Sequence, residues 1–123
     1  MAEDKSSVYE RSGRVVLTIA GYHGLKDAEA CVNTAVELFR RLRSCEFVVD
    51  LRDMSGFDTG SRVIWQQHLQ DFRLHIHTVT IVGGSPLARM SGAAVCLYAG
   101  IKMKFATTLD EAFQAPMSRR ASG

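Results

Sequence analysis

The sequence predicts a single α/β domain with a mixed, mostly parallel sheet of about five strands and four helices. Short segments rich in β-branched residues alternate with longer segments whose apolar residues recur at helical spacing. A Ser12-Gly13 pair separates two strand-like segments and predicts a hairpin with one antiparallel edge. The length of 123 residues suits one domain, which can bury a core without metal ions or disulfides.

The N-terminal half begins with the two hairpin strands, expected over residues 8–11 and 14–20. A helix is predicted over about residues 26–43, because apolar side chains recur there every three or four residues. These are Ala28, Cys31, Val32, Ala35, Phe39 and Leu42. Residues 47–51 have the short, β-branched character of a buried strand, and residues 52–59 are expected to form a loop.

The C-terminal half repeats the alternation. A second helix is expected over about residues 60–75, with Trp65, Leu69, Phe72 and Ile76 on one stripe, and a strand follows over residues 79–83. Ser85 is the expected N-cap of a third helix, which ends near Gly100. In residues 101–105, three apolar side chains alternate with Lys102 and Lys104, which favours an edge strand. Thr108 is expected to cap a short last helix, with Glu111 three residues on completing a capping box.

Composition excludes several classes of protein. The net charge of +2 and the 46% of apolar residues argue against disorder and against nucleic-acid binding by bulk charge. Residues 1–7 do not resemble a signal peptide, and the apolar runs are far shorter than the ~20 residues of a membrane span. We therefore expect a cytoplasmic protein with a flexible N-terminus (1–7), one domain (8–115) and a disordered tail (116–123).

The chemically reactive side chains form no recognisable catalytic or metal-binding pattern. No Ser-His-Asp, Cys-His or paired-carboxylate set is apparent, and the four histidines lack metal-ligand spacing. The odd number of cysteines, three, indicates reduced thiols, with Cys31 and Cys96 in the core and Cys45 nearer the surface. The sequence thus predicts no catalytic residues, no metal and no cofactor.

The segment Asp58-Thr59-Gly60-Ser61 is the first candidate functional site. Asp58 can cap the second helix, which places Thr59 and Ser61 in its first turn. A phosphate on either hydroxyl would face the positive end of the helix dipole, which suits a phosphorylation switch or a partner-binding loop. The alternative is a capped turn without a regulatory role.

This segment also carries a resemblance to the STAS domains of anti-sigma-factor antagonists. Asp50-Leu51 resembles the strand end of that family, and Asp58-Thr59 resembles the start of its Asp-Ser-Ser-Gly loop. The resemblance implies a SpoIIAA-like fold and a non-catalytic role in binding a regulator or kinase. Gly60 departs from the pattern, because it stands where the family carries its phosphorylated hydroxyl.

The chain further resembles a divergent bacterial group that is STAS-like and related to CRAL-TRIO lipid-exchange domains. Asp50-Leu51-Arg52 matches the end of its strand, and the segment from Gly83 to Leu87 matches its Gly-x-x-Pro-Leu turn. For this group the resemblance implies a fold and no activity.

The third helix is the second candidate site, because it has almost no polar side chains. Such a helix should be buried on most sides, which a domain of this size rarely achieves. Its outer face is therefore expected to meet a partner protein or a second copy of the chain, unless loops cover it. The candidate interface residues are Leu87, Met90, Ala94, Leu97 and Tyr98.

Taken together, these features predict a non-enzymatic regulatory module that acts through protein contacts, without nucleic acid or a membrane span. The alternative is a binder of an apolar or lipid-like small molecule, held between the sheet and the third helix.

Overall fold

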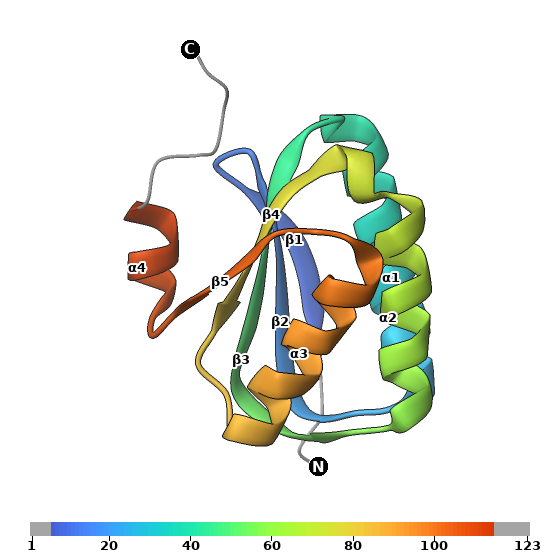
Figure 1. Ribbon diagram of the computed structural model, residues 1–123, viewed down its shortest axis with the longest axis vertical. Helices are drawn as coiled ribbons and strands as arrows, with labels where there is room; N and C mark the ends of the chain where they lie inside the picture. The colour runs from blue at the N-terminus through green and yellow to red at the C-terminus, as the bar shows by residue number, and fades with distance from the viewer. Residues whose placement is uncertain (1–5, 115–123) are drawn as a thin grey trace.

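The computed structural model describes residues 6–114, and they form one five-stranded sheet with helices on both faces (Figure 1). The strands are β1 (Ser7–Arg11), β2 (Arg14–His23), β3 (Cys45–Phe57), β4 (Ile76–Val82) and β5 (Met103–Ala106). The helices are α1 (Leu25–Leu42), α2 (Thr59–Asp71), α3 (Pro86–Ala99) and α4 (Leu109–Gln114), with a 3₁₀ turn, η1, at Arg73–His75. The tail expected at residues 116–123 lies outside the described residues, as does most of the expected N-terminal segment.

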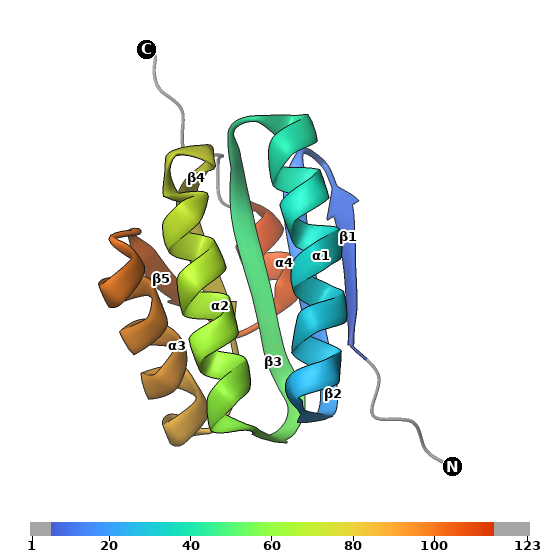
Figure 2. The ribbon, with the colours of Figure 1, turned by 90° about the vertical axis from the view of Figure 1, so that its right-hand side faces the viewer.

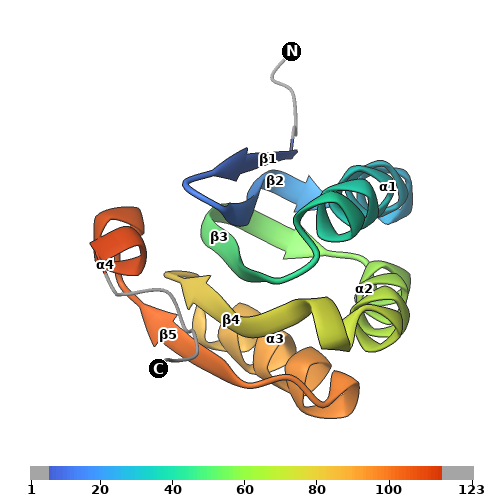
Figure 3. The same ribbon diagram turned by 90° about the horizontal axis from the view of Figure 1, so that it is seen from above.

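The strands lie in the sheet in the order β1-β2-β3-β4-β5, which is also their order in the chain. The hairpin of β1 and β2 is antiparallel, and the other three pairings are parallel. Because crossover connections are right-handed, successive parallel strands added in one direction place all their helices on one face. Accordingly α1, α2 and α3 lie side by side on one face (Figure 2), and α4 lies on the other (Figure 3).

The larger part of the core lies between the sheet and the three helices. The apolar stripe of α1 packs there, and Phe39 meets Phe47 of β3 edge to face with ring centroids 5.2 Å apart. A smaller core lies beneath α4 and contains Val16, Val48, Val82, Ala106 and Ala112. The predicted fold class and element order are confirmed.

A buried ion pair accompanies the smaller core. Arg14 Nε donates to Glu46 Oε1 over 3.2 Å, and both side chains are almost completely excluded from solvent. The guanidinium of Arg14 also lies 5.4 Å from the ring centroid of Phe113 in α4. The pair therefore ties the start of β2 to the start of β3 on the face that α4 covers.

Two sequence-based predictions about β3 and its neighbours are wrong. Residues 52–57, expected to be a loop, continue β3, because the long end of β2 supplies a hydrogen-bonding partner as far as His23↔Phe57. Irregularities in this pairing accommodate the polar and glycine residues that made the segment look like a loop. Cys45, expected near the surface, is fully buried at the first position of β3.

Candidate functional site

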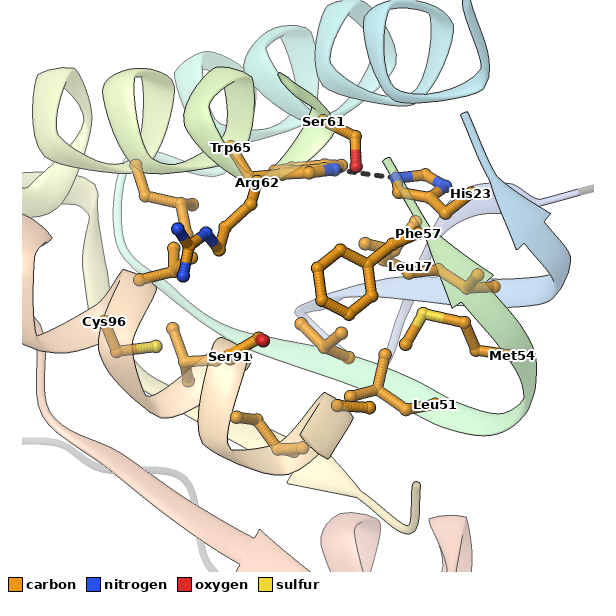
Figure 4. Close-up of a pocket in the computed structure, with 18 of the residues that line it drawn as sticks. Leu17, His23, Leu51, Met54, Phe57, Ser61, Arg62, Trp65, Ser91 and Cys96 are labelled. Carbon is orange, nitrogen blue, oxygen red and sulfur yellow. Dashed lines mark hydrogen bonds between the residues drawn. The ribbon is translucent and has the colours of Figure 1, made fainter. Parts of the chain in front are cut away.

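A cavity with a volume of about 90 Å³ lies between the sheet and the helices α2 and α3 (Figure 4). Its floor comes from side chains that alternate along β2, β3 and β4 and so point to the same face of the sheet. The apolar residues that line it are Leu17, Ile19, Phe47, Val49, Leu51, Met54, Phe57, Trp65, Leu69, Val79, Ile81, Ala88, Gly92 and Val95. No Asp, Glu or Lys among the described residues contributes to the lining.

Small residues of α3 set the height of this cavity. A Cβ atom on Gly92 would lie 2.7 Å from Cδ1 of Ile81, so the helix approaches β4 more closely than a larger residue would allow. Ala88 and Ser91 also line the cavity from α3. Gly92 therefore serves the contact of α3 with the chain's own sheet.

Four polar or reactive side chains reach the lining besides Ser91: His23, Ser61, Arg62 and Cys96. Cys96 is buried, and this burial raises the pKa of its thiol to about 12, so the thiol stays protonated at neutral pH. Arg62 is half-buried, and its side chain extends from α2 toward α3 (Figure 4). Arg62 is therefore the charged group that a cavity ligand would meet.

His23 belongs to a buried hydrogen-bonded chain that connects β2, α1 and α2. Trp65 Nε1 donates to His23 Nε2 over 2.9 Å, and His23 Nδ1 lies 2.8 Å from Asp27 Oδ2. Because the indole nitrogen only donates, Nε2 must accept, and the ring carries its proton on Nδ1. Ser6 Oγ also donates to Asp27 Oδ2 over 2.7 Å. This chain fixes the indole of Trp65 as one wall of the cavity.

The sequence pattern does not predict this arrangement, because it ends the second strand at residue 20, whereas β2 continues to His23. The one local indication is the spacing of four residues between His23 and Asp27, which brackets the start of α1. Trp65 lies 42 residues from His23 in the chain, so its contribution depends on the tertiary fold.

The Asp58–Ser61 segment forms a capped helix start, as predicted for Asp58. The carboxylate of Asp58 accepts from the backbone N–H of Gly60 over 2.7 Å, and Ser61 Oγ donates to the Asp58 carbonyl over 2.6 Å. Ser61 is buried against the cavity, whereas Thr59 is exposed. At Gly60 a Cβ atom would lie 2.6 Å from Cδ2 of Leu25, whose side chain is partly exposed and can move aside.

The outer face of α3 is apolar and open to solvent. Leu87, Met90, Leu97 and Tyr98 are between 67% and 78% exposed. Ala94 is half-buried on the same helix. On this helix only Ala88, Val95, Cys96 and Ala99 are buried. The outer face therefore stays open within residues 6–114, and the alternative that loops cover it does not hold for that part of the chain.

The edge strand β5 contacts α3 near the start of that helix. Phe105 of β5 is 44% exposed, and the guanidinium of Arg89 lies 4.4 Å from its ring centroid. We name the set Leu87, Met90, Leu97, Tyr98 and Phe105 the α3 surface.

Two further findings concern metals and membranes. Within residues 6–114, no three His, Cys, Asp or Glu side chains are grouped as a metal ion would require. Over the same residues, none of the helices combines the length and the apolar character needed to cross a bilayer.

Compared by sequence, the chain matches no protein-family model and no curated protein. Compared by structure, it is similar to an uncharacterised DUF3478-family protein with a SpoIIAA-like fold from Shewanella loihica PV-4. The TM-score is 0.70 at 13% identity, over 93% of this chain and 97% of that one. It is also similar to the anti-sigma factor antagonist SpoIIAA in its unphosphorylated form, with a TM-score of 0.66 at 14% identity, over 89% and 94% of the two chains. The chain therefore has a SpoIIAA-like, or STAS-like, fold.

Proposed function

We propose that the chain is a non-enzymatic regulatory module of the cytoplasm that binds a partner protein, or a second copy of itself, through the α3 surface. The observation that carries the proposal is the exposure of Leu87, Met90, Leu97 and Tyr98 on one helix. Soluble proteins rarely leave large contiguous apolar patches uncovered, and such patches often mark protein interfaces. The similarity to an anti-sigma factor antagonist favours a regulatory role.

The groups at the cavity support a non-enzymatic role. A catalytic thiol needs a lowered pKa, whereas burial raises that of Cys96 to about 12. A catalytic imidazole needs a free nitrogen, whereas both nitrogens of His23 are engaged, with Trp65 and with Asp27. Neither side chain is therefore poised for nucleophilic or acid–base chemistry.

The test of the interface replaces Leu97 and Tyr98 with Asp. Because both side chains are exposed, the free energy of unfolding should change by less than ~1 kcal/mol. Val63→Asp is the matched control, since Val63 is 57% exposed on the neighbouring helix α2. Sedimentation velocity reports self-association, and quantitative affinity capture from the native host reports a partner.

The α3 variant should lose the dimer or the captured partner, and Val63→Asp should retain it. Retention of every association by the α3 variant, or equal loss in the control, would contradict the proposal.

The regulatory part of the proposal is phosphorylation of the Asp58–Ser61 segment. Thr59 is exposed in the first turn of α2, whereas the Ser61 hydroxyl is buried and hydrogen-bonded to a backbone carbonyl. A kinase acting on the folded chain should therefore modify Thr59. Phosphosite mapping on protein from the native host should find phosphate on Thr59 and none in a Thr59→Ala variant. Phosphate confined to Ser61, or no phosphate on either residue, would contradict this.

A second candidate function is the binding of an apolar small molecule, and the cavity between the sheet, α2 and α3 favours it. Ligand sites are typically concave and apolar with a few polar groups, which matches this lining. Native mass spectrometry of the purified protein should show a co-purifying small mass that disappears on denaturation. A single mass equal to that of the chain alone would count against it.

A further inference from the structure

Arg62 reaches the cavity lining, and residues 6–114 supply no counter-ion for it. No carboxylate of these residues lies within ion-pairing distance of Arg62, and its guanidinium makes no hydrogen bond to a described side chain or carbonyl. Three other arginines of the described residues pair with carboxylates: Arg14 with Glu46, Arg41 with Glu10 and Arg52 with Asp50. Arg62 is half-buried on the first turn of α2.

The surroundings of Arg62 make an anion the natural partner. A guanidinium that is partly removed from water is stabilised by a planar oxyanion, because its N–H groups match a carboxylate in two parallel hydrogen bonds. No acidic side chain in the described lining offers such a partner. Ser91 lines the same cavity from α3 and can donate a further hydrogen bond.

The rest of the cavity suits an apolar body. Its other walls are aliphatic and aromatic, including Phe57 and Trp65. The volume of about 90 Å³ is close to the scale of engineered apolar cavities of about 150 Å³ that bind benzene. The body of a ligand is therefore small: one ring, or a short alkyl chain.

We propose that the cavity binds a monocarboxylate with a small apolar body, and that Arg62 pairs with the carboxylate while the apolar body contacts Trp65. This rests on the proposed small-molecule binding, and it adds the charge class of the ligand and the residue that selects it. Arg62 acts here as a specificity-determining residue.

The indole of Trp65 provides the readout, because it is the one tryptophan of the chain and it lines the cavity. Pentanoate and 1-pentanol are the two probes, since they share a short alkyl chain and differ in charge. Both are titrated into the full chain at neutral pH while tryptophan fluorescence is recorded. The variants are Arg62→Gln and Arg62→Lys, and Arg41→Gln, on the outer side of α1, is the control.

For the unmodified chain we expect pentanoate to bind at least ~10-fold more tightly than 1-pentanol, because one charge-assisted hydrogen bond contributes a factor of about that size. Arg62→Gln should remove this preference and leave the affinity for 1-pentanol within about twofold, whereas Arg41→Gln should change neither. Arg62→Lys should keep part of the preference, because it keeps the charge and loses the planar fork.

The outcomes separate the two levels of the proposal. Equal affinities of the unmodified chain for both probes, or a preference that survives Arg62→Gln, would overturn the carboxylate assignment and leave small-molecule binding in place. No saturable fluorescence change with either probe would overturn small-molecule binding itself. Far-UV circular dichroism confirms that each variant is folded, and Arg62→Lys provides the test if Arg62→Gln does not fold.

Discussion

Replacing His23 with Phe should destabilise the folded chain by about 2 kcal/mol. The substitution keeps a ring of similar size but leaves the buried indole N–H of Trp65 without an acceptor, which costs about 1–3 kcal/mol. Asp27 loses a donor as well, but its side chain is 21% exposed and still accepts from Ser6, so water compensates for much of that loss. For a chain of this length the thermal midpoint should fall by roughly 8 °C.

A double-mutant cycle separates the hydrogen bond from the change in packing. Trp65→Phe leaves His23 Nε2 without its donor, whereas the double variant contains neither polar group. The double variant should therefore be more stable than the sum of the single effects predicts, by about 1 kcal/mol or more. Unfolding in urea is followed by far-UV circular dichroism, because Trp65→Phe removes the fluorescent group. Additivity within ~0.5 kcal/mol would refute the reasoning.

Three further predictions follow from buried or capped groups. At pH 8 the thiols of Cys31, Cys45 and Cys96 should react with a disulfide reagent only after unfolding, because burial raises the pKa of each to about 12. Rapid labelling of the folded chain would contradict this. The protonated thiols stabilise the folded chain fully below pH 9, which is the pKa of a cysteine thiol in the unfolded chain. This contribution is lost as the pH rises toward about 12, the pKa of the thiols in the folded chain. Glu46→Ala should destabilise the chain by about 2 kcal/mol in urea unfolding, because it removes the buried carboxylate that accepts from Arg14, and a loss under ~0.5 kcal/mol would contradict this. Hydrogen bonds from the backbone N–H and hydroxyl of Thr107 lower the pKa of Glu111. The stability that these bonds contribute at the start of α4 is therefore complete above about pH 4.5, and it is lost as the pH falls through the lowered pKa of Glu111. The amide resonance of Thr107 should shift in that acidic range, and a flat titration would exclude the bond.

Local chemistry explains the parts of the fold that the sequence predicts correctly. The stripe from Ala28 to Phe39 is buried as expected, since helical spacing puts those side chains on one face. Ser85 accepts from the N–H of Ala88, and Pro86 is the first residue of α3, because both features are local to the turn. These predictions depend on residues within a few positions of one another.

The features that the sequence does not reveal depend on distant parts of the chain. Residues 52–57 are extended only because the far end of β2 pairs with them. The bond between His23 and Trp65 needs β2 and α2 to be adjacent, which no local pattern encodes. The cavity arises from the spacing of three strands and two helices, so its lining could be expected only in outline, between the sheet and the third helix.

The sequential order of the strands has a consequence for how the chain can fold during its synthesis. Each new strand pairs with the one made just before it, so no strand has to wait for a distant segment to leave the ribosome. The helix α3 emerges after β2, β3, α2 and β4, which supply the other walls of the cavity. The cavity is therefore an open groove in the nascent chain until α3 is added, and a ligand present at that stage could enter before the last wall forms.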